Sequence, residues 1–224
     1  MALLITPRLF QTIAWLPLRS VMRLFGRLEI RGSEHLAGLH SNVIFACNHT
    51  SEVDPVLLVA CPPLGSRHIP LVFCARDKRY YASWGWRSAL YGGTFFKLMG
   101  AYPIRSGLKD YAAALETHVG LARTGHSLCI FPAGFHTPGN PYPRARGGVG
   151  YLAHATAIPV VPVHIEGVYD LSPWSLWRGH HRVRVTFGKP IEPPKLEQIT
   201  RVDSDNNPYA EFAHTVMGRV HEIR

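Results

Sequence analysis

A histidine and an aspartate stand five residues apart directly after an apolar run, in the stretch VIFACNHTSEVDP that begins at Val43. If His49 lies in a strand-to-helix turn and Asp54 in the first turn of the helix, the two side chains can meet. A carboxylate bonded to one imidazole nitrogen leaves the other nitrogen as a base near neutral pH. The pair therefore predicts proton abstraction. A structural alternative stays open, in which Asp54 caps a helix that Pro55 begins.

Three further stretches are candidates for the site, and the first two have residue types that suit substrate binding. Arg105, in the run GAYPIRSG, is either a clamp for an anionic group or a plain surface charge. Gly134, in the run FPAGFHT, opens a glycine-rich loop whose backbone N–H groups can hold a phosphate or an oxyanion, or form an ordinary tight turn. The run IPVVPV, from Ile158 to Val163, has two prolines around a strand and is interpreted as structural.

The connection that follows Phe131 is unusually long. Residues 132–150 contain four prolines and five glycines together with His136, Arg144 and Arg146. Connections of this length inside compact domains are usually functional or disordered. Because open α/β sheets bind ligands where their strands end, the position of this loop after a buried strand favours a function.

Past Leu28, short β-rich runs alternate with stretches of helical periodicity, which predicts an α/β fold. We expect a single domain with a mixed, mostly parallel central sheet flanked by helices, because 224 residues are long for one domain and short for two. The predicted strands are Val43–Cys47, Leu71–Ala75, Ala101–Ile104, Ser127–Phe131, Val160–Ile165 and Val183–Phe187. The predicted helices are Pro55–Ala60, Trp84–Leu98, Leu108–Ala122, Gly148–Ala157 and Pro208–Ile223.

The composition, with 46% hydrophobic and 17% charged residues, is that of a globular protein and excludes a disordered chain. Lysine and arginine outnumber aspartate and glutamate by 24 to 15, a net charge of +9 that suits nucleic acid, anionic lipid or a phosphorylated substrate.

The four cysteines lack metal-ligand spacing and are interpreted as free, mostly buried thiols, with a Cys47 nucleophile beside His49 as the alternative. The cysteines are Cys47, Cys61, Cys74 and Cys129.

The N-terminal segment, residues 1–28, is predicted to be an amphipathic helix with arginines on one face and apolar side chains on the opposite face. The arginines are Arg8, Arg19, Arg23 and Arg27, and the apolar residues are Phe10, Ile13, Val21, Leu24 and Leu28. Pro17 is expected to kink or split the helix. Such a segment can lie in a membrane interface, or it can pack on the domain formed by residues 29–224 with a solvated arginine face.

The order of these stretches resembles the glycerolipid acyltransferase superfamily, whose best-known members are the 1-acylglycerol-3-phosphate acyltransferases. Its H-x4-D motif corresponds to His49 and Asp54, and its second block, in shortened form, to Gly100–Arg105. Its F-P-E-G-T-R-S block corresponds to Phe131–Thr137, and its final V-P-[IV]-[IV]-P-V block to Ile158–Val163. The resemblance extends from residue 42 to residue 191, and four blocks in the same order are specific although each block alone is not.

The resemblance implies transfer of a fatty acyl group from acyl-CoA or acyl carrier protein to the hydroxyl of a lysophospholipid such as 1-acylglycerol-3-phosphate. His49 would take the hydroxyl proton, Asp54 would fix the imidazole tautomer, and N–H groups around Gly134 would hold the oxyanion. The residues expected at the acceptor phosphate are Arg105, His136, Thr137 and Arg146. The resemblance implies no metal or redox cofactor, an anionic membrane surface as a partner, and a cytoplasmic protein that is peripherally associated with the membrane.

The third block departs from the family pattern. Ala133, Phe135 and His136 stand where glutamate, threonine and arginine are usual, and in lysophosphatidic acid acyltransferases those polar residues help to hold the acceptor phosphate. We therefore expect a broadened acceptor range, which includes a lysolipid or another alcohol without a phosphomonoester.

Two other classes of protein share some of these features. A serine or cysteine hydrolase would use a His/Asp pair, but the sequence has no G-x-S-x-G elbow. A basic nucleic-acid-binding module would account for the net charge. However, the 24 basic residues are scattered and follow no recognised nucleic-acid motif, so no nucleic acid is expected as a partner.

Overall fold

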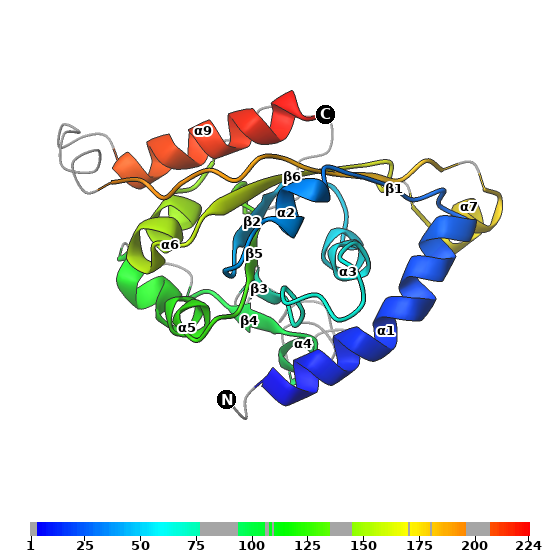
Figure 1. Cartoon of the computed structure of the whole chain (residues 1–224), viewed down its shortest axis with the longest axis horizontal. Helices are drawn as coiled ribbons and strands as arrows, with labels where there is room; N and C mark the ends of the chain where they lie inside the picture. Colours follow the sequence, from blue (N-terminus) through cyan, green and yellow to red (C-terminus); the bar gives the residue numbers. More distant parts are fainter. Residues whose placement is uncertain are drawn as a thin grey trace.

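Seven strands form one mixed sheet at the centre of the computed structural model (Figure 1). The structure describes residues 4–76, 94–105, 108, 110–134, 145–169, 171–179, 181–195 and 207–224. The strands are β1 (Glu29–Arg31), β2 (Ile44–Cys47), β3 (Val72–Ala75), β4 (Ala101–Pro103), β5 (Leu128–Ile130), β6 (Val160–Glu166) and β7 (Arg184–Phe187). They lie in the order β1-β7-β6-β2-β5-β3-β4. From β6 to β4 all neighbours are parallel, and β7 is antiparallel to β6, which confirms the expected mostly parallel α/β sheet.

Helices cover both faces of the sheet (Figure 1). The helices of the described residues are α1 (Ile5–Leu24), α2 (Glu34–Ala37), α3 (Asp54–Ala60), α4 (Thr94–Leu98), α5 (Tyr111–Arg123), α6 (Gly148–Thr156), α7 (Pro173–Trp177) and α9 (Pro208–Glu222). Helices α5, α6 and α9 pack on one face, and α2 and α3 pack on the other, with α1 outside α3.

The alternation of side chains along β2 divides the core into two layers. Ile44 and Ala46 belong to the layer under α5, α6 and α9, whereas Phe45 and Cys47 belong to the layer under α3. Successive side chains of a strand point to opposite faces, so a strand that is buried on both faces must be apolar at every position. All four residues of β2 are buried, and the strand ends where the polar pair Asn48-His49 begins.

The predicted strands and helices agree with the structure to within a few residues wherever the structure describes them. Of the predicted helix 84–98, residues 84–93 lie outside the described part, and Thr94–Leu98 form α4. Three elements of the described residues were missed, and the first of them is the four-residue helix α2. Strand β1 alternates charged and apolar residues over only three positions. Helix α7 has a capping box in which serine replaces the usual glutamate, between Ser172 and Ser175.

Helix α1 packs on the domain, as the packed alternative for the N-terminal segment expected. It continues without interruption through Pro17, so the helix is not split. It packs on the domain through polar contacts, because Gln11 bonds the backbone of Leu71 and Met99, and Arg19 donates to the carbonyls of Ala60 and Cys61 at 2.6 and 2.9 Å. The packed alternative expected all of the arginines to face solvent. Arg19 departs from this, because it contacts the domain.

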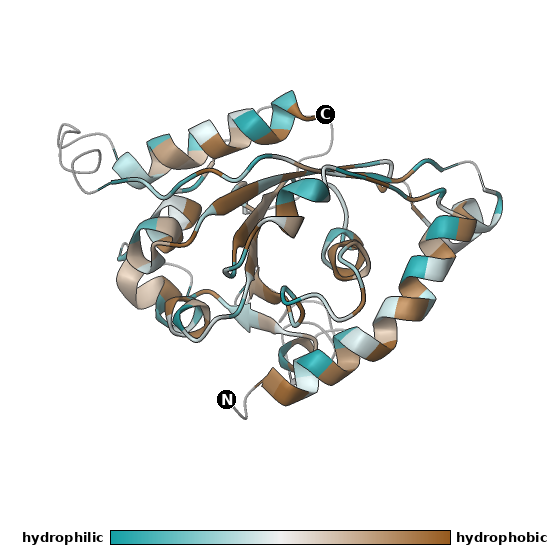
Figure 2. Cartoon of the chain, viewed as in Figure 1, coloured by the Kyte–Doolittle hydropathy of each residue, from teal (hydrophilic) through white to brown (hydrophobic). Residues whose placement is uncertain are grey.

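The apolar face of α1 points away from the domain. Its exposed side chains recur with helical spacing on the side opposite the buried Gln11 and Met22, and Figure 2 shows hydrophobic residues recurring along the helix. The exposed large apolar residues of α1 are Ile5, Leu9, Phe10, Ile13, Leu16, Val21 and Leu24. In the part of the chain that the structure describes, no helix is both long and apolar enough to cross a bilayer.

Candidate active site

The predicted site residues follow strands that end at the same edge of the sheet. His49 follows β2, Gly134 follows β5 and Arg105 follows β4, and these strands are all parallel. Arg76, which was not predicted, follows β3 at the same edge. The carboxyl ends of parallel strands are where open α/β sheets bind ligands, so this edge is the candidate site.

The expected contact between His49 and Asp54 is present. Nδ1 of His49 lies 2.9 Å from Oδ2 of Asp54, which is a hydrogen-bond distance. The Asp54 side chain is completely buried, whereas 16% of the His49 side chain is exposed. With Nδ1–H donating to the carboxylate, the basic lone pair of the imidazole resides on Nε2.

The carboxylate of Asp54 also closes the turn that carries His49. Oδ2 accepts hydrogen bonds from the backbone N–H groups of Thr50 at 2.7 Å and Ser51 at 3.0 Å. Both N–H groups precede α3, and the helix has no side-chain cap at Val53. The alternative in which Asp54 merely caps α3 is therefore wrong, because the carboxylate bonds the turn and the histidine instead.

Asn48, the residue before His49, fixes the end of β2 to β6. Its side-chain amide donates to the carbonyl of Ile165 and accepts from the Ile165 N–H, both at 2.7 Å. The buried Asn48 side chain thus makes the pair of hydrogen bonds that a neighbouring strand's backbone would make. This pairing fixes the position at which β2 ends and the turn to His49 begins. The sequence shows Asn48 beside the histidine, but only the fold shows that its partner lies on β6.

The ring of His49 is held from a second side by Phe131, the residue after β5. The two rings stack with centroids 4.1 Å apart and planes inclined by 24°. Stacking of this kind adds to the burial of the ring faces and restricts rotation of the imidazole. The hydrogen bond to Asp54 and the stacking on Phe131 together define one orientation of His49.

Gly134 forms the tight turn that follows β5. Its backbone has a φ of +73°, a conformation that glycine adopts without steric cost, and its N–H donates to the Phe131 carbonyl at 2.9 Å. The Gly134 N–H is therefore already paired, and an oxyanion role in this region would fall to other N–H groups. The Gly134 carbonyl accepts a hydrogen bond from Nε of Arg76 at 2.9 Å.

Two arginines flank this turn. A Cβ on Gly134 would lie 3.3 Å from Nε of Arg146, so the Arg146 side chain passes directly over the glycine. The Arg146 N–H also donates to the carbonyl of Pro132, which ties the start of α6 to the turn. The sequence contained a signal for Arg76, because it follows a predicted strand directly, as Arg105 does.

Arg105 lies farther from the His49–Asp54 pair. Strands are spaced about 4.8 Å apart, so β4 lies roughly 14 Å from β2, across β5 and β3. The Arg105 side chain is exposed and lies 3.5 Å from a carboxylate oxygen of Glu116 on α5. The predicted residues His136 and Thr137 lie outside the described residues, as does Arg144.

The cysteines are free thiols, as predicted, and all except the half-buried Cys74 are buried. Cys47 lies in the core layer under α3, with its Sγ 3.9 Å from that of Cys129. Burial raises the pKa of the Cys129 thiol well above its usual range. A completely buried Cys47 has no route to a substrate, which argues against the nucleophile alternative.

The described residues form no group of three or more His, Cys, Asp or Glu side chains that could hold a metal ion.

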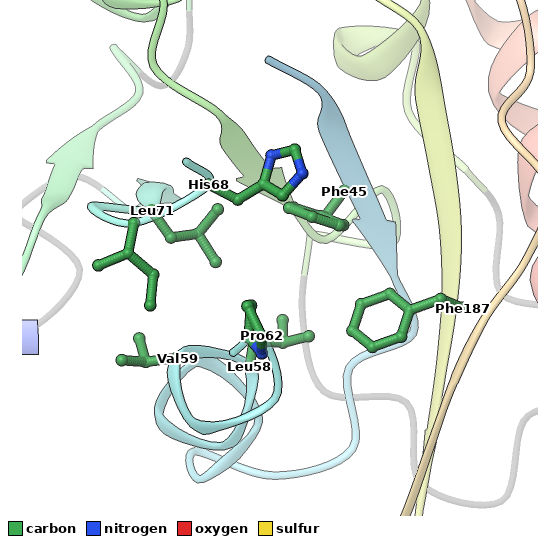
Figure 3. A pocket seen from close by; sticks show the side chains of 8 residues that line it. Phe45, Leu58, Val59, Pro62, His68, Leu71 and Phe187 are labelled. Atoms are coloured by element: carbon green, nitrogen blue, oxygen red, sulfur yellow. The ribbon is translucent and has the colours of Figure 1, made fainter. Parts of the chain in front are cut away.

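Figure 3 shows an apolar pocket between α3 and the sheet, lined by residues such as Phe45, Leu58 and Phe187. A neighbouring cavity of about 590 Å³ shares Pro62, His68 and Phe187 with it. Neither His49 nor Asp54 lines these cavities.

Comparisons with known proteins identify the family of the chain. The Acyltransferase family model matches residues 27–166. A probable 1-acyl-sn-glycerol-3-phosphate acyltransferase of Mycoplasma pneumoniae is 26% identical over 185 residues, which are 77% of this chain and 65% of the relative. The chloroplastic 1-acyl-sn-glycerol-3-phosphate acyltransferase BAT2 of Brassica napus is 24% identical over 195 residues, or 86% of this chain and 52% of the relative.

The crystal structure of the 1-acyl-sn-glycerophosphate (LPA) acyltransferase PlsC from Thermotoga maritima has the same fold. Its TM-score is 0.55 at 18% sequence identity, and the match covers 96% of this chain and 85% of that one. The chain spans about half to two thirds of the length of the curated relatives that it matches. Since the family model matches more than half of the sequence, the chain belongs to the Acyltransferase family.

Proposed function

We propose that the protein transfers a fatty acyl group from an acyl thioester, acyl-CoA or acyl carrier protein, to the free hydroxyl of a lysophospholipid. The observation that carries this proposal is the His49–Asp54 hydrogen bond at the carboxyl edge of the sheet, in a chain of the Acyltransferase family. The similarity to 1-acyl-sn-glycerol-3-phosphate acyltransferases supports a lysophospholipid acceptor.

In the proposed reaction, Nε2 of His49 takes the proton of the acceptor hydroxyl while the hydroxyl oxygen attacks the thioester carbonyl. The C–S bond then breaks, and the imidazolium returns its proton to the departing thiolate, so the enzyme ends unchanged. Asp54 holds the Nδ1–H tautomer and stabilises the imidazolium, as the aspartate does in serine hydrolases. The acceptor itself is the nucleophile, so no acyl-enzyme forms.

The acceptor phosphate is proposed to lie near the turn at Gly134. Arg146 passes over this turn, and Arg76 bonds its carbonyl, so both place positive charge at the edge that carries His49. Arg105 is proposed as a more distant contact, since it lies on the outermost strand. Guanidinium groups bind phosphates through paired, charge-assisted hydrogen bonds. Ala133 is buried and supplies no polar group.

We also propose that the protein associates peripherally with a membrane through α1. The apolar stripe of this helix is exposed to solvent, and Arg8 and Arg23 on the same helix are exposed as well. An interfacial helix needs both features, an apolar face and basic residues that attract anionic lipid. The proposed acceptor is itself a lipid, and a protein at the bilayer would meet it there.

The first prediction concerns the catalytic base. His49→Ala should lower kcat by about 10²- to 10⁴-fold, which is the usual cost of losing a general base, and should leave the fold intact. Asp54→Asn should also lower kcat, because the amide no longer fixes the tautomer of His49. Turnover of labelled acyl-CoA with lysophosphatidic acid measures both. His214→Ala, at an exposed histidine of α9, is the matched control. Near-normal turnover of His49→Ala with unchanged circular dichroism would show that His49 is not the base.

The second prediction concerns the acceptor. Arg146→Ala should raise the KM for lysophosphatidic acid by an amount equivalent to about 1.5–3 kcal/mol, the value of a hydrogen bond to a charged group. Arg105→Ala should have a smaller effect in the same direction. Arg123→Ala, which removes an arginine at the end of α5 that bonds the Ala155 carbonyl, is the control.

The same assay tests the breadth of the acceptor range. Because the third block lacks its usual polar residues, lysophosphatidylcholine should compete with lysophosphatidic acid in the wild-type enzyme. The measurement is the ratio of kcat/KM for the two acceptors. A preference of about a thousandfold or more, roughly 4 kcal/mol, for lysophosphatidic acid would contradict a broadened range.

The third prediction concerns the membrane. The double variant Leu9→Gln/Ile13→Gln replaces two side chains that are 56% and 65% exposed, so the domain should keep its stability. Its binding to phosphatidylglycerol vesicles should weaken, since burying each apolar side chain contributes up to about 1.5–3 kcal/mol. Leu108→Gln, at an exposed apolar residue before α5, is the control. Equal co-sedimentation of the wild type and the double variant would exclude α1 as the membrane contact.

A further inference from the structure

Helix α7 presents two tryptophans to solvent. Trp174 is 64% exposed and Trp177 is 69% exposed, although tryptophan is usually well buried. The helix follows β6 beyond its carboxyl end, so it lies at the same edge of the sheet as His49. Its first turn is fixed by the hydrogen bonds between Ser172 and Ser175. The two rings are therefore held on an ordered element.

Contacts with the end of α1 fix the position of α7. The rings of Trp177 and Phe25 stack with centroids 5.4 Å apart, and Leu176 lies 3.5 Å from where a Cβ on Gly26 would be. Figure 1 shows α7 beside the C-terminal end of α1. The exposed apolar stripe of α1 ends at Leu24, next to this contact. The stripe and the two tryptophans are together named the α1–α7 surface, which consists of Ile5, Leu9, Ile13, Leu16, Leu24, Trp174 and Trp177.

Arginines lie near the tryptophan end of this surface, and the exposed Glu29 after them is paired with Arg31 and Arg184. Arg178 lies over the ring of Trp174, 4.9 Å from its centroid, and Arg178, Arg23 and Arg27 are exposed. Tryptophan prefers the level of lipid head groups, because its ring is apolar and its N–H is polar. Arginine beside it suits an anionic head group. The residue types and the charge of this end therefore match an anionic bilayer.

We propose that the α1–α7 surface docks on an anionic bilayer and that Trp174 and Trp177 are its interfacial anchor. This inference rests on the membrane association proposed above and extends it to a second element, distant from α1 in the sequence. The anchor lies at the carboxyl edge of the sheet, where Asn48 joins the ends of β2 and β6 just before His49.

The test compares the full-length wild type with Trp174→Ala/Trp177→Ala in co-sedimentation with vesicles of phosphatidylcholine and phosphatidylglycerol. The double variant should bind the vesicles at least about tenfold more weakly than the wild type, because two large apolar rings are lost. Trp174→Ala alone keeps the stacking of Trp177 on Phe25 and should show an intermediate loss if the fold is kept. Leu108→Ala is the control and should bind as the wild type does.

Fluorescence quenching by brominated lipid locates the rings directly. Quenching of the wild type should exceed that of Trp174→Phe/Trp177→Phe, which retains aromatic side chains in place of the two indoles. Equal quenching and equal binding of wild type and variants would overturn the inference. If the tryptophan variants bound as the wild type does while Leu9→Gln/Ile13→Gln lost binding, α1 would be the membrane contact and α7 would not.

Two other results would also overturn the proposal. The first is lipid-free dimerisation of the wild type that Trp174→Ala/Trp177→Ala abolishes in sedimentation velocity, which would assign the surface to a second copy of the chain. The second is a wild type that does not bind vesicles at all. Acyl transfer to detergent-dispersed lysolipid is measured separately, so a failure of the docking proposal is distinguishable from a failure of the proposed enzyme activity.

Discussion

The completely buried carboxylate of Asp54 is the contact on which the candidate site depends. A buried carboxylate is costly unless hydrogen bonds satisfy it, and Oδ2 of Asp54 receives three, from the His49 ring and from the N–H groups of Thr50 and Ser51. The same oxygen thus shapes the turn and orients the imidazole. Oδ1 is buried without a hydrogen-bond partner among the described residues. Removing the carboxylate would disturb the turn as well as the histidine.

The parallel sheet brings other residues of the candidate site close to the His49–Asp54 pair. It places the turns after β2, β3 and β5 side by side, so Phe131 can stack on His49 while Arg76 and Arg146 hold the turn at Gly134. Phe131, which lies 82 positions after His49 in the sequence, therefore contacts its imidazole. Two packed core layers support the sheet from both faces, and after β2 the polar residues begin where the strand ends.

The sequence was sufficient for the buried central strands and for the meeting of His49 and Asp54, because buried strands are continuous apolar runs and the two residues lie close along the chain. It was insufficient for β1, which has only one apolar residue among three. It was also insufficient where partners are distant. The contacts of Asn48 with Ile165 and of Arg76 with Gly134 depend on strand order, which no local pattern specifies. The sequence also did not indicate which face of α1 packs on the domain, because polar side chains such as Gln11 make contacts with the domain.

The central claim is that Asp54 holds His49 as the Nδ1–H tautomer with a basic Nε2. Nitrogen-15 NMR of the ¹⁵N-histidine-labelled protein tests it most directly, with His49→Ala used to assign the signal. For the neutral imidazole of His49, the account predicts a protonated Nδ1 and an unprotonated Nε2, and a loss of this preference in Asp54→Asn. A neutral His49 that carries its proton on Nε2, or one whose tautomer is unchanged in Asp54→Asn, would contradict the account.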